Sequence, residues 1–323
     1  MFATLGMFIV DEFAFADKSG NPISKNVPPQ IGGGGTYAAI GARIWLPPTR
    51  VGMIIDRGTD FPQSIQATLD EFGSDMWHYR DHPGKTTRAL NSYRGDFRDF
   101  EYLTPRIRLT PRDLQGTRLE RPNYLHFICS PTRAFTIMDE VQQVSDWNPT
   151  VIYEPIPDRC VPEELDALVQ VLPRINILSP NADEAFGLLS MPLPVSRSGI
   201  EAACQRFLAF SHPPAAVIIR SGAMGACVAV VGQPIRWVDA FWSESHPDKI
   251  VDVTGAGNSF LGGLAAGLLL ENGNILRATY YASVSASFVI EQQGLPKLSE
   301  AGDWNGDSPQ RRLEQLNTSK VVV

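Results

Sequence analysis

The sequence predicts an α/β protein built on a mostly parallel β-sheet that helices cover on both faces. Short apolar runs, bounded by glycine, proline or polar residues, recur along the chain. Stretches with the residue pattern of helices lie between most of these runs. Such alternation is typical of βαβ units, whose crossover helices bury both faces of the sheet. The 323 residues suit one large domain of this kind or two smaller ones.

The predicted strands are the apolar runs at residues 4–10, 51–55, 124–129, 150–153, 175–178 and 216–219. The predicted helices between them lie at residues 62–72, 134–147, 162–172 and 199–209. Parallel strands of such a sheet end at a common edge, and ligands bind outside that edge. We therefore expect functional residues directly after these strands.

Two segments interrupt the alternation and predict a small β flap outside the main sheet. Residues 85–110 are rich in Thr, Arg, Tyr and Phe, and residues 91–99 within them have the composition of a turn between two strands. Residues 12–30 follow the first strand and become polar and proline-containing from Asp17 on. We expect both segments to belong to the same flap.

Gly32, Gly33, Gly34 and Gly35 precede a predicted helix of small residues that begins at Thr36. Glycine permits a flexible turn, and it also lets backbone approach a ligand closely. The four glycines alone favour neither interpretation.

Asn181 and Glu184 follow the strand at residues 175–178 and stand one helical turn apart. An amide and a carboxylate at that spacing suit a hydrated Mg²⁺ beside phosphates. The alternative is a helix cap with acidic residues in the first turn, which is the commoner arrangement. Further along, residues 220–226 separate two β-like runs, as either a hairpin turn or a phosphate-facing turn would.

The most informative segment covers residues 252–263. Small residues at Gly255, Ala256 and Gly257 let backbone N–H groups converge, and the apolar run at 260–270 predicts the helix that they open. The N-terminus of a helix attracts anions. Asn258, which cannot take up a proton, stands where a catalytic carboxylate would be most useful.

Composition excludes several classes of partner. The formal net charge is −7 and the arginines are scattered, which argues against nucleic acid or an anionic membrane as a main partner. The four cysteines lie far apart, so we expect buried free thiols rather than a zinc site or disulfides. The N-terminus lacks a basic region before its apolar residues, and the run at 260–270 is too short to span a bilayer. We expect a soluble, cytoplasmic protein.

In this order, the motifs resemble those of the pfkB (ribokinase-like) family of carbohydrate and nucleoside kinases. The match extends from Gly6 to about Gly294, and its wording is closest to the fungal maintenance-of-killer branch. Residues 252–263 are similar to the family's C-terminal signature, and residues 32–43 resemble its N-terminal glycine signature.

The resemblance implies one ribokinase-like α/β domain over residues 1–323, in three layers. Residues 12–30 and 85–110 would form its substrate-covering lid, and residues 299–323 are expected to be a peripheral tail. The implied cofactors are ATP and Mg²⁺, with K⁺ as a reasonable accessory. The implied partners are a small-molecule substrate and, through the lid, a second copy of the chain.

The family's site residues carry over to matching positions of this sequence. The substrate-binding residues would be Asp11, Gly33, Gly34, Gly35 and Thr36. The nucleotide-binding residues would be Asn181, Glu184, Ser221, Gly222, Gly225, Thr254 and Gly257. The catalytic group would be the anion hole of Gly255, Ala256 and Gly257, with Asn258 beside it. Glu184 would hold Mg²⁺ through water, and Asp252 would neighbour a monovalent cation.

Two positions depart from the family pattern. Thr36 or Tyr37 stands where the family often has an asparagine that contacts sugar. Asn258 replaces the family's catalytic aspartate, and general-base help of that kind contributes a factor of about 10²–10⁴ in rate.

Three hypotheses follow from Asn258. In the first, the chain is a kinase in which Asn258 orients the nucleophile, and water or another carboxylate such as Asp11 takes the proton. In the second, it is a kinase whose acceptor is already anionic, such as a carboxylate. In the third, it is a nucleotide-binding pseudokinase. Phosphoryl transfer depends mostly on positioning and charge stabilisation, so a site without the base can still accelerate it. We rank the kinase first, because a scaffold has no physical need of an anion hole.

Overall fold

The computed structural model describes residues 1–25, 27–94 and 97–318. Residues 26, 95–96 and 319–323 lie outside the described residues, and with them small parts of both predicted flap segments and the end of the predicted tail.

The main sheet has nine strands in the order β13-β12-β11-β10-β9-β8-β1-β4-β5. The strands from β11 to β5 run parallel, while β12 and β13 add an antiparallel edge. Their bounds are β1 Phe2–Thr4, β4 Val51–Arg57, β5 Trp77–Asp81, β8 Tyr124–Cys129, β9 Thr150–Pro155, β10 Ile177–Leu178, β11 Ala216–Arg220, β12 Ala226–Val230 and β13 Arg236–Val238.

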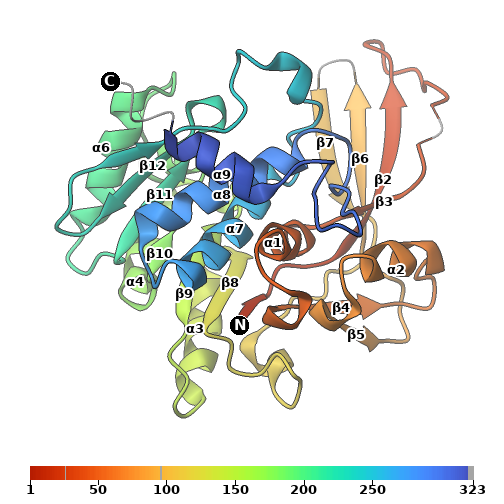
Figure 1. Cartoon of the computed structure of the whole chain (residues 1–323), viewed down its shortest axis with the longest axis horizontal. Coiled ribbons are helices and arrows are strands. Elements are labelled where there is room, and N and C mark those ends of the chain that lie inside the picture. The colour runs from red at the N-terminus through yellow and green to blue at the C-terminus, as the bar shows by residue number, and fades with distance from the viewer. Residues whose placement is uncertain (26, 95–96, 319–323) are drawn as a thin grey trace.

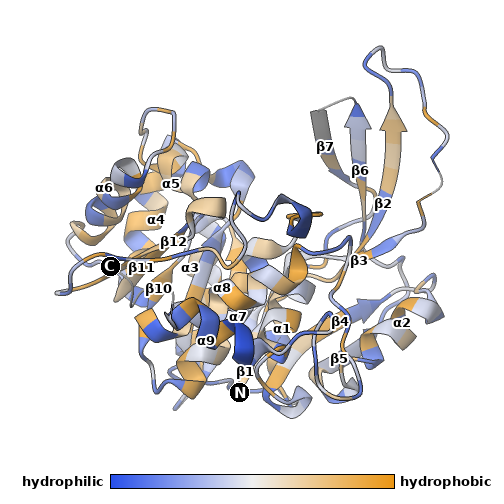
Figure 2. Cartoon of the chain, turned by 45° about the horizontal axis from the view of Figure 1, so that its top comes forward, coloured by the Kyte–Doolittle hydropathy of each residue, from blue (hydrophilic) through white to orange (hydrophobic). Residues whose placement is uncertain are grey.

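Helices cover both faces of this sheet (Figure 1). Alternate residues of one strand enter different cores: Ile218 packs in the core under α1, α2, α7, α8 and α9, while Val217 and Ile219 pack in the core under α3 to α6. The bounds are α1 Gly34–Arg43, α2 Gln63–Asp70, α3 Pro131–Gln143, α4 Leu165–Val171, α5 Ala182–Leu188, α6 Arg197–Leu208, α7 Ala256–Leu270, α8 Ile275–Val289 and α9 Pro309–Thr318. Figure 2 shows apolar residues concentrated in the central strands and polar residues on outer helices such as α6.

The three-layer α/β architecture predicted from the sequence is confirmed.

A second sheet stands apart from the main one (Figure 1) and has the order β3-β2-β6-β7. Its strands are β2 Ile9–Ala16, β3 Gln30–Gly32, β6 Arg88–Arg94 and β7 Phe97–Tyr102. Both segments for which we predicted a flap contribute strands to it. Its action as a lid stays a prediction.

The strand predicted at residues 4–10 is wrong, because the chain changes sheets there. β1 ends at Thr4 in the main sheet, and β2 begins at Ile9 in the second sheet. Leu5 and Phe8 between them are buried, so the apolar run continues through the crossing and hides it. At the crossing, Gly6 lies so close to Gly35 that a Cβ on Gly6 would be 2.6 Å from the Gly35 backbone.

Close packing of α1 on α7 brings the tetraglycine segment beside the start of α7. A Cβ on Gly41 would lie 2.0 Å from the Ser259 carbonyl oxygen, and a Cβ on Gly262 would lie 1.8 Å from that of Ala38. Only glycine permits such an approach of two helix backbones. The contact therefore joins the N-terminal and C-terminal motifs of the sequence.

The expectation of a peripheral tail from residue 299 is contradicted in the described part of that segment. Trp304 is 1% exposed and Arg312, in α9, is 3% exposed. The Arg312 guanidinium pairs with Glu291 at 2.7 Å and with Asp307 at 2.9 Å. The polar composition of α9 conceals one buried face, which consists of Pro309, Arg312 and Leu316. No helix in the described part of the chain is long and apolar enough to cross a bilayer.

Candidate active site

A cavity of about 1530 Å³ lies between the second sheet and the carboxyl ends of the parallel strands. It brings together residues from the N-terminal, central and C-terminal motifs. Of the predicted site residues, those that line it are Asp11, Gly33, Gly34, Asn181, Glu184, Ser221, Gly222, Gly225, Thr254, Gly255, Ala256, Gly257 and Asn258. The turn after β11 joins two antiparallel strands, so the hairpin interpretation of residues 220–226 is confirmed. The turn also lines the cavity, and its place beside a phosphate stays a prediction.

Three predicted residues are absent from the described lining: Gly35, Thr36 and Asp252. Thr36 is fully buried and donates its hydroxyl to the Gly32 carbonyl oxygen at 2.8 Å, so it does not offer a substrate contact. Gly35 is fixed against Gly6. The Asp252 side chain contacts its own loop, where Oδ1 accepts a hydrogen bond of 2.9 Å from the Thr254 backbone N–H.

Tyr37 faces the cavity in place of Thr36, and its ring lies against Gly255. A Cβ on Gly255 would be 2.3 Å from that ring. Gly255 also has a φ of 77°, a left-handed conformation that favours glycine. Its conformation turns the chain into α7, whose first residues are Ala256 and Gly257.

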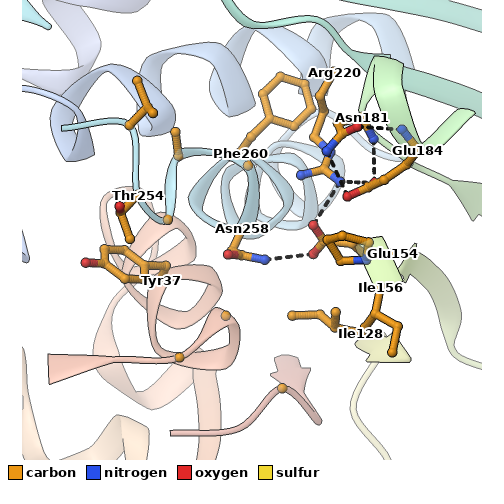
Figure 3. Close-up of a pocket in the computed structure, with 18 of the residues that line it drawn as sticks. Tyr37, Ile128, Glu154, Ile156, Asn181, Glu184, Arg220, Thr254, Asn258 and Phe260 are labelled. Atoms are coloured by element: carbon orange, nitrogen blue, oxygen red, sulfur yellow. Dashed lines mark hydrogen bonds and ion pairs between the residues drawn. The ribbon is translucent and has the colours of Figure 1, made fainter. Parts of the chain in front are cut away.

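Asn258 is held by Glu154, a residue that the sequence did not single out (Figure 3). Glu154 stands near the end of β9 and is 5% exposed. Its Oε2 accepts a hydrogen bond of 2.9 Å from Asn258 Nδ2. Because the amide nitrogen is engaged there, Asn258 Oδ1 is the atom that remains for a ligand.

His126, fully buried on β8, lies behind Glu154. The Thr4 hydroxyl oxygen accepts the Gly6 backbone N–H at 3.0 Å and lies 2.9 Å from His126 Nδ1. A hydroxyl oxygen has two lone pairs and one proton, so Thr4 donates to Nδ1 in one tautomer of the imidazole and accepts from it in the other. His126 Nε2 faces the Glu154 carboxylate and lies 3.4 Å from its Oε2.

Glu154 is kept ionised although it is buried. Burial opposes its ionisation, but the Arg220 guanidinium, His126 and Asn258 outweigh that effect and hold the pKa of Glu154 below its ordinary value. Arg220 Nη2 lies 2.8 Å from Glu154 Oε1. The carboxylate therefore serves as an anionic anchor for Asn258 rather than as a ready proton acceptor.

Asn181 and Glu184 form the helix cap that was the commoner of the two interpretations. Asn181 Oδ1 accepts the Glu184 backbone N–H at 2.8 Å, and Glu184 accepts the Asn181 backbone N–H at 2.7 Å and its Nδ2 at 2.8 Å. Burial, with the negative charge of Glu154 adding to it and Arg220 opposing it, raises the pKa of Glu184 to about 7. Both side chains nonetheless line the cavity.

Arg220, the last residue of β11, is the second cavity residue that was not among the predicted site residues, although it begins the segment 220–226. Its Nη2 contacts Glu154, donates to the Ser179 carbonyl oxygen at 3.0 Å and lies 3.4 Å from Glu184 Oε2. One signal would have found both missed residues. Arg220 and Glu154 are charged residues at the carboxyl ends of apolar strands of the same parallel sheet, which is the edge where ligands bind.

The cavity lining carries further charges. Four arginines line the cavity, together with three aspartates. They are Arg106, Arg108, Arg133 and Arg159, with Asp11, Asp99 and Asp158. The Arg106 guanidinium lies over the Tyr102 ring at 4.8 Å. Among the described residues, no group of three or more His, Cys, Asp or Glu side chains is arranged to hold a metal ion.

Comparison with known proteins gives consistent matches. The family model for "pfkB family carbohydrate kinase" matches residues 118–300. An uncharacterized Schizosaccharomyces pombe protein is 35% identical over 97% of this chain and 92% of its own length. Protein MAK32 of Saccharomyces cerevisiae is 35% identical over 94% of this chain and 88% of its own length. The structure of Arabidopsis thaliana ribokinase complexed with ribose and ATP aligns with a TM-score of 0.69 at 18% identity, over 98% of each chain.

Proposed function

Because the chain belongs to the pfkB family of carbohydrate kinases, we propose that it is an ATP-dependent phosphotransferase that acts on a hydroxyl group of a small molecule. Its fold is ribokinase-like, and its likeness to fungal relatives agrees with the resemblance noted in the sequence. One observation carries the proposal: a single cavity joins Asp11 and the tetraglycine segment to the start of α7 and the turn after β11.

The nucleotide would lie on the side of the cavity formed by Ser221, Gly222 and Gly225, with Thr254 near its phosphates. Its terminal phosphate would meet the backbone N–H groups of Ala256 and Gly257. Neither group has an acceptor within α7, although the Ala256 N–H donates to the Val253 carbonyl oxygen at 3.2 Å. Both carry the positive end of the helix dipole. Donors fixed in advance at the place where charge develops are the main contribution a protein makes to phosphoryl transfer.

The acceptor would lie between Asp11 and Asn258. Asn258 Oδ1 accepts hydrogen bonds and cannot donate them, so it suits a hydroxyl at the reacting atom and would repel a carboxylate there. This favours the first hypothesis over acyl phosphate formation. The arginines on the substrate side favour acceptors that carry a carboxylate or phosphate away from the reacting hydroxyl.

The family implies a metal ion in addition to ATP. Glu184, the predicted Mg²⁺ residue, does not fit that role in this arrangement. Both its oxygens accept hydrogen bonds from Asn181, and the Arg220 guanidinium stands beside it. We therefore assign no step to a protein-held Mg²⁺. Asp252 remains our candidate neighbour for K⁺, in the loop before α7.

The proposal is tested by ADP formation with a panel of sugars, nucleosides, hydroxy acids and sugar phosphates. ATP affinity is measured in parallel by calorimetry. We expect ADP release that depends on one hydroxyl-bearing class and a phosphorylated product of matching mass. ATP binding without turnover on any acceptor would favour the pseudokinase, and turnover confined to carboxylic acids without hydroxyls would favour acyl phosphate chemistry.

A further inference from the structure

The position of Arg220 carries an inference about the phosphate site, and it rests on the proposed function. We propose that the Arg220 guanidinium supplies the positive charge of that site and binds the nucleotide's terminal phosphate directly. It stands beside Glu184, where the family resemblance places Mg²⁺. The affinity of the chain for nucleoside triphosphates would then depend little on a divalent ion.

The hydrogen bonds of the guanidinium leave one side of it for a ligand. Its contacts with acceptors in the described part of the chain, on Glu154, Ser179 and Glu184, all run through Nη2. Nη1 points toward the start of α7, where a Cβ on Gly257 would lie 2.1 Å from it. A phosphate on the Gly257 N–H would therefore also be adjacent to Nη1. The buried Nε has no hydrogen-bond partner in the described structure.

The surrounding charges hold the guanidinium in this place. Glu154 and Glu184 flank Arg220, and both are about 6% exposed or less. The Arg220 side chain is 11% exposed, so little water screens the interaction. A divalent ion beside Glu184 would meet this fixed positive charge and would have to displace it. Guanidinium groups bind phosphate with paired N–H donors, which makes Arg220 a suitable substitute.

Gly257 and Asn258 agree with this assignment. A side chain at position 257 would fill the space that Nη1 occupies. An aspartate at position 258 would add a third carboxylate near Glu154 and Glu184, whereas the neutral amide leaves Arg220 as the source of positive charge. Asn258 and Arg220 together would give a site with fewer negative charges and a built-in cation.

The test is the affinity of adenylyl imidodiphosphate, a non-hydrolysable ATP analogue, measured by calorimetry in EDTA and in Mg²⁺. For the wild-type protein we expect the two dissociation constants to agree within about tenfold. For Arg220→Gln we expect affinity in EDTA to fall by about 10-fold to 100-fold, the effect of losing a charged hydrogen-bond donor. Adenosine affinity, which involves no phosphate, should be unchanged in that variant.

Arg277→Gln is the matched control, because it removes the same charge from an arginine outside the cavity that pairs with Glu271. Arg220→Gln leaves Glu154 without its main partner, so a second measurement uses proteins that keep Arg220, the wild type and Glu184→Gln. Mn²⁺ titration without nucleotide, followed by electron paramagnetic resonance, should detect no tight site that depends on Glu184.

Two results would overturn the assignment and leave the proposed function intact. The first is that the analogue's dissociation constant depends on Mg²⁺ equally in the wild type and in Arg220→Gln. The second is that the wild type binds Mn²⁺ tightly and Glu184→Gln abolishes this binding. Absence of nucleotide binding by the wild type under both conditions would instead contradict the proposed function.

Discussion

At the residue scale, Asn258 acts through the way its amide is held. Glu154 accepts from Nδ2 at 2.9 Å, and the same carboxylate is fixed by Arg220 and faced by His126. The orientation of Oδ1 toward the cavity is thus set by three buried groups on three different strands. An acceptor hydroxyl bound to Oδ1 would be directed at the phosphate, and its proton would pass to water or to another carboxylate such as Asp11 as the bond to phosphorus forms.

This geometry changes the expectation for Asn258→Asp. A simple loss of the base predicts that the aspartate raises hydroxyl phosphorylation by about 10²–10⁴. Here the new carboxylate would face Glu154 at hydrogen-bond distance, and the two would share a proton. We expect a smaller gain, with a rate that rises with pH through a pKa above the usual carboxyl range. The pH profile of kcat/KM measures this.

The double variant Asn258→Asp with Glu154→Gln is the matched comparison. It restores an amide–carboxylate pair in reverse order and leaves the new aspartate without a like-charged neighbour. We expect its rate to exceed that of Asn258→Asp alone at neutral pH. A larger gain in the single variant would show that Glu154 does not control position 258.

The residues that carry the site could be predicted from sequence only where the signal is local. Asp11, Gly34 and Asn258 belong to short motifs, and the structure places all three on the cavity. Glu154 accepts a hydrogen bond from Asn258, 104 residues further along the chain, and no local sequence pattern predicts this contact. Thr36 and Tyr37 are neighbours in one helix, and only packing against Gly32 and Gly255 determines which of them faces the ligand.

At the scale of the element, the start of α5 combines a helix cap with a titrating group. The pKa of Glu184 lies at about 7 in the folded protein, above its ordinary value of 4.5. Ionisation is therefore less favourable in the folded state than in the unfolded state. The stability that Glu184 contributes is fully present below pH 4.5 and is lost as pH rises through about 7.

Glu184→Gln keeps an oxygen for the Asn181 backbone N–H, gives up the hydrogen bond from Asn181 Nδ2 and removes this titration. We expect the variant to gain stability relative to wild type between pH 4.5 and about 7, by an amount on the order of 1–3 kcal/mol. Urea unfolding of both proteins across this range measures the difference. A difference that stays constant with pH would show that Glu184 titrates normally.

The α1–α7 contact is the second element on which the site depends. An alanine at position 262 would place its Cβ 1.8 Å from the Ala38 carbonyl oxygen and force the helices apart. We expect Gly262→Ala to lower the free energy of unfolding by about 1–3 kcal/mol, the usual effect of overpacking.

ATP affinity should fall as well, because the start of α7 would shift from the tetraglycine segment. Leu270→Ala, at the exposed end of the same helix, is the control and should have a smaller effect. An unchanged urea midpoint for Gly262→Ala would contradict the packing argument.

Element boundaries were predictable where a strand or helix has clear ends. The strand β8 coincides with the predicted range 124–129. The crossing between β1 and β2 could not be predicted, because burial of Leu5 and Phe8 maintains the apolar pattern through it. The edge strand β5 was also missed, since only its first residue, Trp77, is buried.

At the scale of the whole molecule, the C-terminal segment closes the core beside the cavity. Arg312 donates to Ser287 of α8 and lies over the rings of Phe288 and Trp242, at 3.7 Å and 5.3 Å. Trp242 and Phe241 line the cavity, so α9 supports this part of the cavity wall from behind.

Arg312→Ala should lower the free energy of unfolding by about 3–5 kcal/mol, because it leaves Glu291 and Asp307 without their buried partner. ATP affinity should fall with it. Arg311→Ala is the matched control: Arg311 is 62% exposed, and we expect a change within about 0.5 kcal/mol. Similar effects of the two variants on urea unfolding would contradict the anchoring role of Arg312.

The central claim, that the start of α7 is a phosphoryl-transfer site facing Asn258, is tested most directly by a crystal structure with adenylyl imidodiphosphate. The account predicts the terminal phosphate on the backbone N–H groups of Ala256 and Gly257, with Asn258 Oδ1 on the acceptor side of it. A triphosphate bound elsewhere, or directed away from Asn258, would contradict the claim.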